Sequence, residues 1–91
     1  MGTPKDDPVV NELREQISEL DRSIFDAVNR RLTLVAQLKK HKDEQGYSFV
    51  DPGREAEMIA AQAAANPGPL SNTGLRAFYT ELLALTKREV G

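Results

Sequence analysis

The most regular apolar repeat in the chain is LREQISELDRSIFDAVNRRLTLVAQL, residues 13–38. Apolar side chains recur in it at steps of three and four, which is the spacing of one face of an amphipathic α-helix. Residues 9–45 contain neither proline nor glycine, whereas Pro8 precedes them and Gly46 follows. Because these two residue types mark helix ends, the sequence predicts one helix of 37 residues.

Two shorter helices are predicted after this one. Asp51 is the predicted N-cap of the second helix because a proline follows it at the first helical position, and this helix runs to about Ala65. The segment NPGP at 66–69 ends it, and Ser71 is the predicted N-cap of a third helix that runs nearly to Gly91. No segment alternates β-branched and polar residues between turns, so the predicted fold is all-α, with three helices.

The length of the first helix predicts a dimer. Thirty-seven helical residues span about 55 Å, whereas a compact chain of 91 residues has a diameter of only about 30 Å. The apolar positions continue across the predicted overhang and need a cover, which a second copy of the chain supplies. We therefore expect an intertwined homodimer. The apolar positions that form this stripe are Leu13, Ile17, Leu20, Ile24, Val28, Val35 and Leu38.

Composition excludes several classes of function. Twelve Lys and Arg against fourteen Asp and Glu give a net charge of −2, which argues against a nucleic-acid binder. No cysteine is present and His41 is the one histidine, so thiolate or multi-histidine metal sites and a cysteine nucleophile are not expected. No apolar run is long enough for a membrane helix, and the start of the chain lacks a secretory signal. We expect a cytoplasmic protein with a disordered tail at 1–8 and one domain at 9–91.

Three cations interrupt the apolar side of the first helix. On a helical wheel Arg31 and Lys42 project from the middle of the apolar arc, and Arg14 lies at its edge. Cations in an apolar seam are costly unless each has an anionic partner. One interpretation pairs them with acids of this chain, such as Glu55 or Glu89, or extends the lysine head group to solvent. The other is that an external dianion binds there, since few acids share these faces.

The same residues also form a recognisable pattern. The pattern is L-R-E-x-I-x-x-L-D at 13–21, Arg31, Lys42 and V-D-x-x-R-E at 50–55. It resembles the helical (AroQ-type) chorismate mutases, and the resemblance extends from about Leu13 to Val90. The spacing holds over three segments, with 17 residues from Arg14 to Arg31, 11 to Lys42 and 9 to Asp51.

The resemblance implies a fold and an activity. The family protomer has three helices, and its long first helix pairs with that of a second protomer, so that an arginine of each chain enters the other's site. The implied activity is that of an isomerase, the Claisen rearrangement of chorismate to prephenate in phenylalanine and tyrosine biosynthesis. The family reaction uses no cofactor and no metal, and its substrate is a small dicarboxylate.

The resemblance also implies the role of each site residue. Lys42 would face the ether oxygen, where negative charge gathers as the C–O bond breaks. Arg31 and Arg14 of the partner subunit would clamp the two carboxylates. Around the ring hydroxyl and the carboxylates, the positions that match the family are Asp51, Arg54, Glu55 and Thr86. The four cations of this set against its two acids leave two positive charges, as a dicarboxylate requires.

Purely structural explanations exist for this second group. Asp51 is explained equally well as an N-cap, and Arg54 and Glu55 as an exposed pair in a first helical turn. Arg54 would otherwise orient Glu55 or a substrate carboxylate, and Glu55 with Asp51 would accept hydrogen bonds from the ring hydroxyl. Thr86 matches a family Ser or Thr that contacts a carboxylate, although a threonine on an apolar stripe more often serves packing.

One position departs from the family pattern. Many members carry Gln or Glu four residues beyond the position of Thr86, and its side chain bonds the ether oxygen. Here that residue is Val90, which has no donor, while Glu89 lies one position away. Loss of such a donor typically lowers the rate by roughly a hundredfold. One expectation is therefore a weak free enzyme that a partner activates, as the first shikimate-pathway enzyme does for some small chorismate mutases.

Two other functions compete with this one. An enzyme of the same fold would act on a related substrate, as a 4-amino-4-deoxychorismate mutase or an isochorismate-pyruvate lyase. The D-x-x-R-E motif at 51–55 is more typical of the mutases. A non-catalytic helical dimerisation module would account for the long seam but not for the cations within it.

Overall fold

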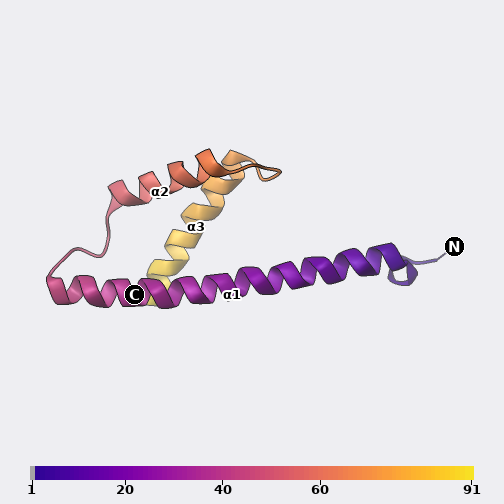
Figure 1. The fold of residues 1–91 in the computed structure, drawn as a ribbon, viewed down its shortest axis with the longest axis horizontal. Coiled ribbons are helices and arrows are strands. Elements are labelled where there is room, and N and C mark those ends of the chain that lie inside the picture. The colour runs from indigo at the N-terminus through magenta and orange to yellow at the C-terminus, as the bar shows by residue number, and fades with distance from the viewer. Residues whose placement is uncertain (1) are drawn as a thin grey trace. The chain divides into compact units, whose positions relative to one another are not determined.

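The computed structural model describes residues 2–91, which contain three α-helices and no strand. Both the all-α fold class and the three predicted helices are confirmed. Every predicted helix end agrees with the structure to within one residue. The elements in chain order are a 3₁₀ turn η1 (Pro4–Asp6), α1 (Pro8–Gln45), α2 (Pro52–Ala65) and α3 (Asn72–Val90), labelled in Figure 1.

The chain divides into two units, one ending at Thr33 and the other running from Leu34 to Gly91. In the first unit, η1 precedes α1, and the Asn11 side chain donates a hydrogen bond to the Lys5 carbonyl at 2.9 Å. The disorder expected for residues 1–8 stays a prediction, and Met1 lies outside the described residues.

A glycine ends α1. The Gly46 N–H donates to the Asp43 carbonyl at 3.2 Å, and the Tyr47 N–H donates to the Lys42 carbonyl at 2.8 Å. These two bonds form a Schellman motif, which needs a left-handed residue after the helix. Gly46 supplies it, with a φ of 75°. The motif therefore fixes the backbone of Lys42 at the point where the chain leaves the helix.

Side-chain caps begin α2 and α3. The Asp51 carboxylate accepts from the Arg54 N–H at 3.1 Å, and the Ser71 hydroxyl accepts from the Gly74 N–H at 3.0 Å. Between the helices, the Asn66 side chain donates to the Leu70 carbonyl at 2.7 Å. These local bonds close the turn between the two helices. Figure 1 shows the chain reversing its direction there, between α2 and α3.

Within the second unit, α2 packs against α3. The Tyr79 hydroxyl of α3 lies 3.8 Å from the sulfur of Met58 in α2. Ala63 and Thr86, both 5% exposed, are the buried side chains of the described residues. Two helices with so few buried side chains form only a small core.

Most of the apolar stripe of α1 is exposed, although Val28 and Val35 are half-buried. The helix has no buried residue, and four stripe positions in the first unit are between 50% and 63% exposed: Leu13, Ile17, Leu20 and Ile24. Complete burial of one Leu or Ile side chain stabilises a fold by about 1.5–3 kcal/mol. Covering this stripe with another apolar surface would therefore be strongly stabilising. In residues 2–91, no helix is both long and apolar enough to cross a membrane.

Candidate active site

Lys42 stands at the last turn of α1, where the connection to α2 folds back on it. Its Nζ is half-buried and donates to the Phe49 carbonyl oxygen at 3.4 Å. Lys39 also contacts Phe49, but through the aromatic ring, since its Nζ lies 5.7 Å from the ring centroid. An ammonium group has three donors, so Lys42 retains N–H groups for an anionic ligand.

Asp51 has the predicted capping role. Its Oδ1 accepts the Arg54 N–H, which places the carboxylate over the first turn of α2. The Arg54 guanidinium lies 3.6 Å from a carboxylate oxygen of Glu57, and both side chains are mostly exposed. In this structure Arg54 is therefore paired with Glu57, three residues further along the helix, whereas the sequence interpretation paired it with Glu55 or a ligand.

Two substitutions distinguish the roles considered for Asp51, which are capping of α2 and hydrogen bonding to the substrate. We expect Asp51→Ala to lower the free energy of unfolding by about 1 kcal/mol, because the cap of α2 is lost. Asn is an equally good cap, so Asp51→Asn is expected to leave stability nearly unchanged. Urea unfolding, at one protein concentration for all variants, measures both effects.

Ser71→Ala is the matched control for Asp51, because it removes the corresponding cap of α3. It shows how much activity is lost with a cap alone. If Asp51→Asn lowers kcat/KM for the substrate that the resemblance implies and Ser71→Ala does not, Asp51 also acts on that substrate. If Asp51→Asn keeps full activity, Asp51 is a cap and no more.

Glu55 is held by a residue of another helix. Its Oε1 lies 3.0 Å from the Nζ of Lys87 in the last turn of α3, and the Glu55 side chain is only 24% exposed. The sequence analysis missed Lys87. The signal that identifies it is topological: helices joined by a short turn pack antiparallel, so the first turn of α2 meets the last turn of α3.

Thr86 precedes Lys87 and is buried. Its hydroxyl donates to the Leu82 carbonyl at 2.7 Å, which agrees with the packing role considered for it. The α3 helix continues through Val90, and Gly91 N–H donates to the Lys87 carbonyl at 3.0 Å. Glu89 is exposed. The helical register thus keeps valine at the position where many family members carry a donor.

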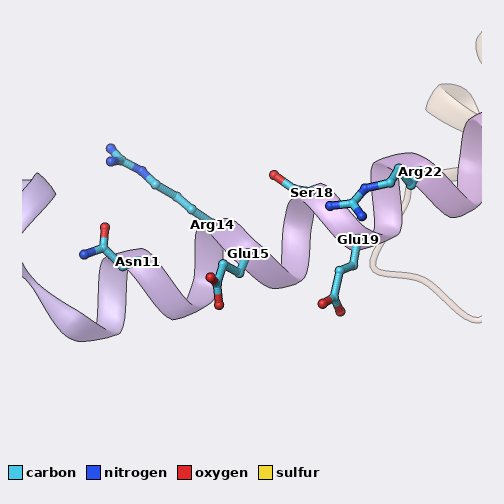
Figure 2. A pocket seen from close by; sticks show the side chains of 6 residues that line it. All are labelled: Asn11, Arg14, Glu15, Ser18, Glu19 and Arg22. Carbon is cyan, nitrogen blue, oxygen red and sulfur yellow. The ribbon is translucent and has the colours of Figure 1, made fainter.

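Arg14 and Arg31 belong to the unit that ends at Thr33. Arg31 is half-buried and Arg14 is exposed. Arg14 lines a shallow depression along α1, and Figure 2 shows its side chain extended on the side of the helix that carries Ser18, whereas Glu15 and Glu19 point the other way. The depression is lined by Asn11, Arg14, Glu15, Ser18, Glu19 and Arg22.

The spacing of these two arginines limits what they bind together. Seventeen residues separate them on one helix, which is about 25 Å along its axis. A small dicarboxylate with a single six-membered ring is much shorter than that. The two guanidinium groups of one chain therefore cannot clamp the same small dicarboxylate.

Within Leu34–Gly91, the structure joins Glu55 to α3 through Lys87 and places Asp51 and Arg54 on the same helical turn. In residues 2–91, no group of three or more His, Asp or Glu side chains is arranged to hold a metal ion. The chemistry available at these positions is hydrogen bonding and charge. Such groups bind and orient an anion and stabilise charge that develops on it.

Comparison with known proteins identifies the family. The profile described as chorismate mutase type II matches residues 13–90. The chain belongs to the chorismate mutase type II family. The resemblance found in the sequence is thereby confirmed, over the same residues from which it was drawn.

Solved structures support the same assignment. Form I of the chorismate mutase from Thermus thermophilus has 30% identity and a TM-score of 0.83, and the match covers 85% of this chain and 96% of that one. Form II has 28% identity and a TM-score of 0.85, with coverage of 89% and 92%. The three-helix arrangement is therefore the fold of chorismate mutases of this family.

A curated relative matches a shorter stretch. The T-protein of Enterobacter agglomerans is 38% identical over 50 residues, which is 55% of this chain. The match spans only 13% of the length of that relative. The similarity therefore concerns 50 residues and a small part of that relative.

Proposed function

We propose that this protein catalyses the rearrangement of chorismate to prephenate, as a homodimer. The observation that carries the proposal is the family match over residues 13–90, which includes every candidate site residue. Lys42 gives it a chemical basis. Its half-buried ammonium is bonded to a neutral carbonyl, so its charge is available to an anion.

The reaction needs no group other than the substrate itself. The ether C–O bond breaks as a C–C bond forms within the same molecule, and no proton, electron or leaving group is exchanged. The protein therefore has two tasks, which are to fold the dianion into its reacting conformer and to stabilise the charge on the ether oxygen. In the proposed mechanism Lys42 donates to that oxygen as negative charge develops, so it binds the transition state better than the ground state.

The remaining candidates bind and orient the substrate. Arg31 and Arg14 of the partner subunit hold the two carboxylates in planar, two-point contacts that a lysine cannot make. Asp51 and Glu55 accept hydrogen bonds from the ring hydroxyl. In this proposal Arg54 and Thr86 complete the polar contacts around the carboxylates.

Two observations support the homodimer. The exposed apolar stripe of α1 leaves side chains such as Ile17 and Leu20 more than half accessible in a single chain. Arg14 and Arg31 are also too far apart on one helix to serve the same ligand. A second copy would cover the stripe and would bring its own Arg14 to the site.

The test is an assay with three substrates. We expect loss of the diene absorbance of chorismate, prephenate as the product by NMR, and a sedimentation mass of twice the chain. Faster turnover of 4-amino-4-deoxychorismate, or release of pyruvate from isochorismate, would replace the proposed substrate with that one. If none of the three substrates is turned over, the proposed enzymatic function is refuted, and the non-catalytic dimerisation module becomes the favoured interpretation.

The same assay addresses the activating partner. Val90 in place of a donor leads us to expect a low kcat/KM that rises when the first enzyme of the shikimate pathway is added. A kcat/KM that does not respond to that enzyme removes this part of the proposal. The cytoplasmic location expected from the sequence stays a prediction.

A further inference from the structure

We propose that Lys87 is a positioning and specificity-determining residue. It holds the Glu55 carboxylate in place and partly offsets its negative charge, so that the site prefers a substrate with a neutral ring hydroxyl over one with a ring ammonium. The inference rests on the proposed function, in which Glu55 faces that ring substituent.

The geometry of the pair distinguishes it from an ordinary surface contact. Lys87 Nζ and Glu55 Oε1 are 3.0 Å apart, and they join the last turn of α3 to the first turn of α2. The pair of Arg54 with Glu57 is longer, at 3.6 Å, lies within one helix and is more exposed. Lys87 therefore fixes a carboxylate across a helix–helix contact, where its position depends on tertiary structure.

The arrangement has a consequence for hydrogen bonding. A carboxylate has two oxygens and about four lone-pair sites, and Lys87 engages Oε1. Oε2 can then accept a hydrogen bond from a ligand donor. Because the ammonium holds one oxygen, rotation of the carboxylate is restricted, and less conformational entropy is lost when the ligand binds.

The arrangement also has a consequence for charge. Lys87 partly neutralises Glu55, so a second cation at the same carboxylate gains less Coulomb energy and is repelled by the first. A neutral hydroxyl does not meet that repulsion. Lys87 thus penalises the protonated amine of 4-amino-4-deoxychorismate relative to the hydroxyl of chorismate.

The experiment measures this preference by competition. Chorismate turnover is followed with 4-amino-4-deoxychorismate as the competitor, at a pH at which the amine is protonated, and the ratio of KM to Ki is determined. In Lys87→Met we expect this ratio to rise about fivefold in favour of the amine, the size typical for one partly exposed ion pair. Lys87→Arg keeps the charge and is expected to keep the ratio of the unsubstituted protein.

Arg88→Met is the matched control, because it removes a cation from the same turn of α3 and Arg88 is exposed. It is expected to leave the ratio unchanged. In a Glu55→Gln background, Lys87→Met is expected to lose most of its effect, since the two residues act as a pair. Lys87→Gln repeats the neutralisation should Lys87→Met not fold, and circular dichroism identifies folded variants.

The outcomes separate this inference from the proposed function. If the unsubstituted protein turns over chorismate and the ratio is the same in the Lys87→Met or Lys87→Gln variant, only the role of Lys87 is overturned. The same holds if Arg88→Met shifts the ratio as much as Lys87→Met does. If the unsubstituted protein does not turn over chorismate, the proposed function fails and this inference fails with it.

Discussion

Replacement of Lys42 by alanine is expected to lower kcat for chorismate by at least about a hundredfold, the usual effect of removing one donor aimed at a developing oxyanion. The reason is that the ammonium interacts most strongly when the ether oxygen carries negative charge. KM is expected to change much less than kcat, because the carboxylates bind elsewhere. Steady-state kinetics with chorismate measures both constants.

The loss is not expected to come from unfolding. The hydrogen bond from Lys42 to the Phe49 carbonyl is long, at 3.4 Å, so its removal costs little stability. Lys40→Ala is the matched control, because it removes an exposed lysine from the same end of α1. Full turnover in folded, dimeric Lys42→Ala would show that the mechanism is wrong even if the activity is right.

The helix ends were predictable because the residues beside them determine them. Gly46 ends α1 through a backbone conformation that glycine adopts without strain, and the N-caps Asp51 and Ser71 bond N–H groups three residues away. Each of these signals involves a few consecutive residues. A single sequence contains all the information that they need.

The pairing of charges between elements was not predictable in this way. Helical periodicity placed Lys42 in the apolar arc of α1, but its partner is the carbonyl of Phe49, from a connection without periodicity. Glu55 was considered as a partner for a seam arginine, whereas the structure pairs it with Lys87, 32 positions further along the chain. Residues so far apart meet only because α2 and α3 pack together, and a helical wheel treats each helix alone.

Arg14→Ala is expected to lower kcat/KM for chorismate by about a hundredfold, as removal of one partner of a desolvated charge pair does. The physical reason is that a substrate carboxylate loses its two-point partner. Arg22→Ala is the control, because Arg22 is another exposed arginine that lines the same depression on α1. It is expected to keep full activity.

The dimer proposal makes a sharper prediction from the same variant. If Arg14 serves the site of the other subunit, a heterodimer of one Arg14→Ala chain and one Lys42→Ala chain contains one intact site and one doubly damaged site. We expect this heterodimer to have about half the activity of the unsubstituted dimer, because one of its two equivalent sites remains. Co-expression of the two chains with different affinity tags isolates the heterodimer. The homodimer of each variant alone is expected to be nearly inactive.

A reciprocal pairing gives the opposite result. An unsubstituted chain paired with a chain that carries both Arg14→Ala and Lys42→Ala has one defect in each site, because each site takes Lys42 from one chain and Arg14 from the other. This heterodimer is expected to be nearly inactive. If it keeps half the activity and the first heterodimer does not, Arg14 and Lys42 of one chain act in the same site. If Arg14 acts in the site of its own chain, Arg31 of that chain cannot bind the same substrate, because the two arginines are about 25 Å apart along α1. Arg31 would then lose its assigned role.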